Sequence, residues 1–201
     1  MSALSEVLQS QLLLAARLLS YPDTEWRADL PDLEHEASEL AQREARLRAA
    51  AASSPKSADG QDDSAVFSRF ACFARQVDAK AFEVDYVNLF DLSRDTTLYL
   101  ASYQAGDPAQ HRKNLLAYST WYVEEGFEAT DESYDYLPAV LELASQMPPR
   151  KAADILAHAQ GSLEALADAL GKVGQPEYAA LVRQVIALGR RLADSSKEEV
   201  A

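Results

Sequence analysis

Apolar residues recur along this chain at helical spacing and divide it into amphipathic segments. Residues 5–20 carry leucine and alanine at intervals of three or four along one face, and Pro22 stops this segment. A short helical turn around Trp26 follows, and Pro31 then opens a longer, highly charged helix with a narrow apolar seam. The spacing therefore predicts that the chain before residue 51 is helical.

The rest of the chain keeps the same period. Residues 64–77 and 82–90 each place aromatic side chains on one helical face. The stripes that begin at Leu137, Ala152 and Tyr178 predict three further helices, and between the two groups Asp107-Pro108 opens a helix that ends near Gly126. The polar tail from Asp194 to the end is expected to fray. The inner face of the helix after Pro108 is predicted to carry His111, Leu115, Tyr118 and Tyr122.

These segments predict an all-α, single-domain helical bundle that covers residues 1–201. No stretch alternates between apolar and polar residues as a half-buried strand does, and every proline falls at a predicted helix edge or in a loop. Residues 51–63 contain Ser, Pro, Gly and Asp without an apolar anchor, so we expect a mobile loop there. A domain boundary at this point would leave too few residues before it for an independent core.

The helical period fails in the middle of the chain. Tyr86 and Phe90 still belong to a core-facing stripe, but after Asp91 a polar, aromatic and β-branched segment runs to Gly106. It lacks the Ala and Glu density of the other segments. We interpret the connection from Asp91 to Tyr103 as the functional part of the chain, shaped to line a groove that the helices frame.

Charge narrows the range of partners. The chain has 19 Lys and Arg against 32 Asp and Glu, a formal net charge of -13. Such a surface repels phosphate backbones and anionic lipid, so nucleic acid is not an expected partner and a cationic peptide or protein is favoured. Solubility alone is the simpler explanation of an acidic surface. The first apolar run follows no basic region and is broken by polar residues, so we expect neither a signal peptide nor membrane insertion, and a cytoplasmic location.

The residues of common catalytic and metal sites do not cluster in the sequence. Cys72 is the single cysteine, and His35, His111 and His158 belong to no HExxH pattern. There is no Gly-rich phosphate loop and no GxSxG turn. A small hydrolase that uses Asp91 and His111 is a weak alternative, because no oxyanion-hole signature accompanies them. We therefore predict a protein that is not an enzyme and that holds no metal and no tightly bound cofactor.

What remains is a mixture of aromatic and charged side chains in and after the central connection. They could form a recognition groove for a cationic amphipathic segment, with carboxylates meeting basic side chains and tyrosines meeting apolar ones. Each also has a structural explanation: Asp107 as an N-cap, Asp131 and Asp135 at the positive end of a helix dipole, Tyr118 and Tyr122 as core. The candidate binding residues are Tyr86, Asp91, Arg94, Asp95, Tyr99, Tyr103, Asp107, His111, Tyr118, Tyr122, Asp135, Tyr136 and Glu142.

Two ordered motifs give the chain a resemblance to a known family. Residues 86–94 (YVNLFDLSR), 98–100 (LYL) and 106–112 resemble the signature of the NarJ family, and 135–138 (DYLP) with Leu141-Glu142 resemble its second motif. This family comprises assembly chaperones of respiratory nitrate reductase and belongs to the wider TorD/DmsD group of maturation proteins for molybdenum enzymes. The similarity is densest over residues 82–143.

The resemblance implies a chaperone that acts on a molybdenum cofactor enzyme. Such a protein binds the N-terminal segment of the catalytic (alpha) subunit of nitrate reductase, holds it during cofactor insertion and delays its docking to the membrane. It implies a helical bundle that is a monomer or a weak dimer. A helical adaptor that binds the Tat signal peptide of a different molybdenum enzyme is the main alternative.

Overall fold

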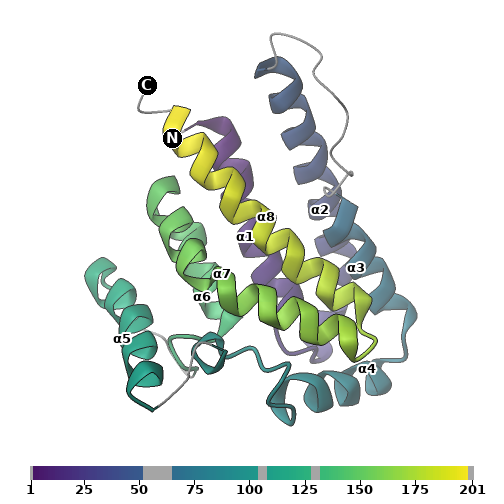
Figure 1. The fold of residues 1–201 in the computed structure, drawn as a ribbon. Helices are drawn as coiled ribbons and strands as arrows, with labels where there is room; N and C mark the ends of the chain where they lie inside the picture. The colour runs from purple at the N-terminus through teal and green to yellow at the C-terminus, as the bar shows by residue number, and fades with distance from the viewer. Residues whose placement is uncertain (1, 52–64, 104–107, 128–131, 199–201) are drawn as a thin grey trace.

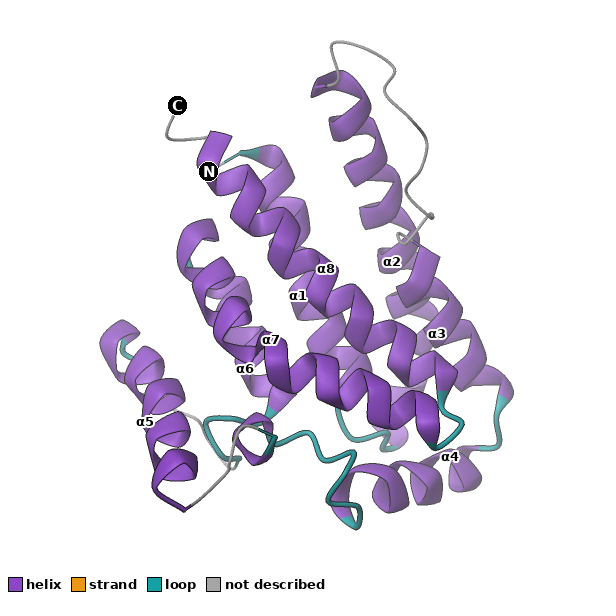
Figure 2. Ribbon diagram, viewed as in Figure 1, coloured by secondary structure: helices purple, strands orange, loops and turns teal. Residues whose placement is uncertain are grey.

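The computed structural model describes residues 2–51, 65–103, 108–127 and 132–198. These residues form eight α-helices, a π-helical turn and a 3-10 turn, and they contain no strand, which confirms the all-α prediction (Figure 2). The predicted loop at 51–63, except Ala51, and the candidates Asp107 and Asp131 lie outside the described residues. The elements are α1 (Ala3–Leu19), α2 (Thr24–Ala51), α3 (Val66–Gln76), α4 (Ala79–Tyr86), η2 (the π-helical turn, Val87–Asp91), η3 (the 3-10 turn, Leu100–Ser102), α5 (Pro108–Glu125), α6 (Leu137–Gln146), α7 (Pro149–Lys172) and α8 (Pro176–Glu198).

Helix α1 lies inside the bundle and packs against α2, α6 and α8. Helices α7 and α8 form a hairpin, whose turn has Gly174 at φ 78° and the Gln175 N–H donating to the Leu170 carbonyl at 2.9 Å. Helix α5 lies at the outer edge of the bundle (Figure 1). The predicted apolar stripes of α6, α7 and α8 are all buried.

The end of α8 lies against the start of α1. The Ser5 hydroxyl donates to the Ser195 hydroxyl at 3.4 Å, and both side chains are buried. Helix α8 continues to Glu198, through most of the tail that is predicted to fray from Asp194. Its polar composition hid the fact that Ser195 lies on the inward face of the helix.

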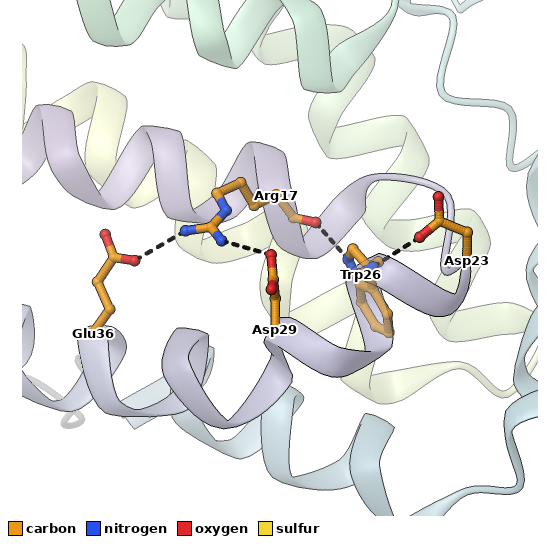
Figure 3. Close-up of polar contacts among 5 residues, drawn as sticks. All are labelled: Arg17, Asp23, Trp26, Asp29 and Glu36. Carbon is orange, nitrogen blue, oxygen red and sulfur yellow. Dashed lines mark hydrogen bonds and ion pairs between the residues drawn. The ribbon is translucent and has the colours of Figure 1, made fainter.

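Polar contacts fix α2 across α1 (Figure 3). Arg17 of α1 forms ion pairs with Asp29 at 3.2 Å and Glu36 at 3.3 Å, two residues that lie two turns apart on α2. At the start of α2, Asp23 accepts a hydrogen bond from the Trp26 N–H at 2.8 Å, and the Trp26 indole donates to the Arg17 carbonyl at 2.6 Å. The chain therefore turns back on itself within a few residues after Arg17.

Helix α2 is continuous through Pro31, so the predicted separation into a short turn and a later helix is wrong. Proline lacks an N–H and removes one intrahelical hydrogen bond. Trp26, Leu30, Leu33 and Ala37 are buried on one face on both sides of the proline. Burial of that continuous face against the bundle offsets the loss of a single bond.

An aromatic cluster lies at the end of the bundle where α8 begins, and it confirms the predicted stripe of residues 82–90. Tyr178 of α8 packs with its ring centroid 4.9 Å from Phe70, 6.2 Å from Phe82 and 5.0 Å from Phe90. After α4 the helix widens into the π-helical turn η2, in which the Leu92 N–H donates to the Val87 carbonyl at 3.0 Å. Regular helix thus ends where the helical period of the sequence fails.

Candidate functional site

A surface cavity of about 460 Å³ lies between the second half of α1, the end of α5 and one face of α6. Two lining side chains come from α1 and the residue just after it, two from α5 and the residues just after it, and the remainder from α6 and the residues before it. The cavity is lined by Leu13, Ser20, Tyr122, Phe127, Glu132, Tyr136, Pro138, Ala139, Glu142, Leu143 and Gln146. We refer to it below as the α1–α6 cavity.

The lining combines apolar surface with carboxylates. Leu13 is 37% exposed and Phe127 is 42% exposed, so both present apolar surface to the cavity. Glu132 and Glu142 form no ion pair with any cation in the described part of the chain. Burial raises the pKa of Glu142 above its ordinary value. The cavity can therefore accept a ligand that is apolar on one side and cationic on the other.

Tyr136 is held in the wall of the cavity by two other tyrosines. Its ring lies 5.5 Å from that of Tyr99, and the two residues form an isolated antiparallel bridge. The Tyr136 and Tyr86 hydroxyls are 3.2 Å apart, and the Tyr86 hydroxyl donates to the Leu19 carbonyl at 2.9 Å. Tyr86 is thus a buried support behind the cavity rather than part of its surface, although it was a candidate binding residue.

Three carboxylates surround Tyr136. The Tyr99 hydroxyl donates to Glu132 at 2.9 Å, and burial together with this hydrogen bond raises the pKa of Tyr99 to about 12. Asp91 lies at the end of η2 on the surface. Partial desolvation, and then the nearby charge of Glu132, raises the pKa of its carboxyl group. Burial raises the pKa of Tyr136, with contributions from the charges of Glu132, Asp91 and Glu142. Negative potential is thus concentrated at this end of the cavity.

No residue of the connection from Asp91 to Tyr103 lines this cavity, and its role in lining a groove stays a prediction. Leu98 and Leu100 are buried, and the Leu98 carbonyl accepts from the Leu137 N–H at 2.9 Å. The Tyr103 hydroxyl donates to the Thr97 carbonyl at 2.7 Å and to the Asp95 carbonyl at 3.1 Å. The aromatic and β-branched residues of the connection therefore pack against the rest of the protein. Arg94 and Asp95 are exposed and lie outside the cavity.

Asp135 was a candidate binding residue, but its side chain is buried in the structure. Asp135 precedes α6 and is 2% exposed. Its carboxylate accepts from the Ala101 N–H at 3.0 Å and from the Ser133 hydroxyl at 2.6 Å, while its carbonyl accepts from the Leu100 N–H at 3.0 Å. The carboxylate therefore joins η3 to the start of α6 and is not available to a ligand.

The predicted inner face of α5 is confirmed, but only one of its candidates reaches the cavity. Tyr122 lines it, with its ring 5.1 Å from that of Tyr134. Tyr118 is fully buried against His158 of α7, with ring centroids 5.2 Å apart. His111 is half-buried, with Nδ1 3.4 Å from the Ala101 carbonyl oxygen. Tyr118 and His111 therefore attach α5 to the bundle.

Sequence reasoning overlooked most of the apolar lining. Ala139, Leu143 and Gln146 lie at intervals of four and three, which marks a second face of α6 beside the buried stripe, and this signal was present in the sequence. Leu13 lies among leucines that are buried on α1, so its exposure depends on where α6 packs. Glu132 shares a charged stretch with Asp131 and gave no separate signal.

The described residues contain no candidate metal site and no candidate membrane span. No group of three His, Cys, Asp or Glu side chains within 2–51, 65–103, 108–127 and 132–198 could hold a metal ion. Within the same ranges, no helix is long and apolar enough to cross a membrane. The α1–α6 cavity combines exposed apolar side chains with carboxylates that have no described counter-ion.

Comparison with known proteins shows which family the chain belongs to. A relative from Bacillus subtilis (strain 168), the probable nitrate reductase molybdenum cofactor assembly chaperone NarJ, is 29% identical over 171 residues, which are 85% of this chain and 83% of the relative. The nitrate reductase-like protein NarX of Mycobacterium tuberculosis (strain H37Rv) is 32% identical over 121 residues, 57% of this chain but only 18% of NarX. Residues 56–180 match the nitrate reductase delta subunit family, and the chain therefore belongs to that family, as the motifs of its central stretch predicted.

Proposed function

We propose that this protein is an assembly chaperone for a nitrate reductase, and that the α1–α6 cavity binds the N-terminal segment of the enzyme's catalytic subunit. Family membership supports the first part, because the Bacillus subtilis relative is described as a probable chaperone for assembly of the nitrate reductase molybdenum cofactor. The observation that carries the second is the coexistence of exposed Leu13 and Phe127 with Glu132 and Glu142 in one cavity.

A short basic helix with one apolar face has the chemistry that this cavity would complement. Its apolar side chains would enter among Leu13, Tyr122, Tyr136 and Leu143, and its Lys or Arg residues would approach the carboxylates. An exposed ion pair contributes about 0 to 1 kcal/mol, whereas full burial of a Leu or Phe side chain contributes about 1.5 to 3 kcal/mol. Apolar contacts therefore hold the complex, and the carboxylates mainly increase its rate of formation.

Binding of this kind gives the chaperone a place in the assembly sequence. While the N-terminal segment occupies the cavity, the catalytic subunit stays away from the membrane and remains open to molybdenum cofactor insertion. The chaperone itself then needs neither catalytic residues nor a tightly bound cofactor, and it works in the cytoplasm. The main alternative client is the Tat signal peptide of a different molybdenum enzyme, which offers the same basic and apolar chemistry.

Calorimetric titration with the N-terminal peptide of the cognate catalytic subunit tests the proposal. We expect saturable binding, and Leu13→Ala should weaken it about fivefold, because truncation of a partly exposed leucine removes about 1 kcal/mol of apolar contact. The matched control is Val173→Ala, another exposed apolar side chain, which does not line the cavity. Equal effects of the two substitutions would place the peptide elsewhere, and absence of binding to the wild type would refute the function. A parallel titration with a Tat signal peptide decides between the two clients.

A further inference from the structure

Helix α5 exposes large apolar side chains on the face that points away from the bundle, where a surface helix normally carries polar ones. Leu116 is 66% exposed and Val123 is 71% exposed, both on the outward face. On the inward face the hydroxyls of Tyr118 and Tyr122 and the side-chain nitrogen of Asn114 are buried, with no hydrogen-bond partner among the described residues. Solubility does not explain the outward face, since exposed leucine and valine do not promote it.

The outward face of α5 is also basic. Arg112 and Lys113 are exposed and form no ion pair with a described carboxylate, although the chain carries a net charge of -13. Arg112, Leu116 and Val123 are spaced by four and seven residues, which places them on one face of a helix. An 18-residue helix with a basic, apolar stripe has the same chemistry as the ligand proposed for the α1–α6 cavity.

We propose that the outward face of α5 docks into the α1–α6 cavity of a second copy of this chain. Charge complementarity selects this occupant: Arg112 and Lys113 of one copy meet Glu132 and Glu142 of the other. Leu116 and Val123 supply the apolar contacts, and α5 lies at the edge of the bundle, where its outward face is accessible (Figure 1). The inference rests on the proposed function, because the client peptide and the second copy use the same cavity.

Such docking regulates the chaperone by competition. At high chaperone concentration the cavity is covered by a neighbour, and its apolar lining is protected from non-specific contacts. A client peptide displaces the neighbour, because only one of them can occupy the cavity. The apparent affinity for the peptide therefore falls as chaperone concentration rises, whereas the intrinsic affinity of a free cavity stays constant.

Sedimentation analysis over a range of protein concentrations tests the docking. We expect the wild type to associate reversibly and an excess of client peptide to dissociate it. The double substitution Leu116→Glu with Val123→Glu should weaken association at least about tenfold, since it replaces apolar contacts by charges that repel the acidic cavity. The matched control, Val84→Glu with Val173→Glu, changes the same number of exposed apolar residues outside both surfaces and should associate as the wild type does.

A mixing experiment distinguishes this contact from a symmetrical one. A variant with Glu132→Lys and Glu142→Lys has a damaged cavity but an intact α5, and the Leu116→Glu, Val123→Glu variant has the opposite defect. Neither should associate alone, yet a mixture of the two should form a complex, because each supplies what the other lacks. Failure of the mixture to associate overturns the proposal, as does wild-type association of the α5 variant.

Failure of this inference can be separated from failure of the proposed function. The Leu116→Glu, Val123→Glu variant keeps the whole lining of its own cavity and should bind the client peptide with full intrinsic affinity. If it binds the peptide while the wild type never self-associates, only the docking is refuted. If neither protein binds the peptide, the proposed function is refuted.

Discussion

Replacing Asp135 by alanine is expected to lower the free energy of unfolding by about 3 kcal/mol. Asp135 is 2% exposed, and its carboxylate accepts hydrogen bonds from the Ala101 N–H at 3.0 Å and from the Ser133 hydroxyl at 2.6 Å. Alanine leaves the Ala101 N–H, itself in a buried residue, without that acceptor. Hydrogen bonds to charged groups contribute about 1.5 to 3 kcal/mol, and an unsatisfied buried donor adds a desolvation cost of about 1 to 3 kcal/mol.

Urea unfolding followed by circular dichroism measures this loss. The matched control is Asp135→Asn, whose side-chain oxygen can still accept from the Ala101 N–H and which should lose no more than about 1.5 kcal/mol. The alanine variant should also bind the client peptide less well, because Tyr136 of the cavity follows Asp135 directly and its position depends on the same junction. If both variants are as stable as the wild type, Asp135 does not join η3 to α6 as described.

The fold was largely predictable because its information is local. Apolar residues at intervals of three and four, together with proline and glycine at segment ends, located the buried faces of α1, α3, α6, α7 and α8. The predicted break at Pro31 is an error, because burial of Leu30 and Leu33 outweighs the local preference of proline on α2. On α8, Ser195 is buried although the segment around it is polar.

The site was predictable only in part, because its residues meet through tertiary packing. Tyr122, Tyr136 and Glu142 were among the candidates and do line the cavity. Residue type identified Asp135 and Tyr86 as candidates too, but the same polar groups that serve recognition also satisfy buried backbone donors and acceptors. Sequence could not separate these roles, since the partners, such as the Leu19 carbonyl for Tyr86, lie far away in the chain.

The buried and the exposed polar residues around Tyr136 have different roles. The buried groups, Tyr86 and Asp135, fix the ring and the chain beside it, whereas the exposed groups, Glu132 and Glu142, carry charge that no described cation neutralises. Leaving carboxylates without counter-ions near apolar surface contributes little to folding. It does prepare the cavity for a cationic ligand, because carboxylates without counter-ions attract positive charge.

Reversing the charge of both cavity glutamates should therefore affect binding far more than neutralising them. With Glu132→Lys and Glu142→Lys, a basic peptide meets like charges, which cost several kcal/mol when brought together, and we expect affinity to fall at least about 100-fold at low salt. Calorimetry at rising ionic strength should recover part of the loss, because salt screens exposed charges.

The control for this charge reversal must change the net charge of the chain by the same amount. Asp32→Lys with Asp154→Lys alters the total equally at two exposed positions that lie outside the cavity and that form no ion pair with the described residues. If attraction were a property of the whole acidic surface, both double variants would lose affinity alike. A loss confined to the cavity variant, seen mainly as slower association, assigns the steering to Glu132 and Glu142. The acidity of the chain would then act locally, at the cavity where these two carboxylates lie beside exposed Leu13 and Phe127.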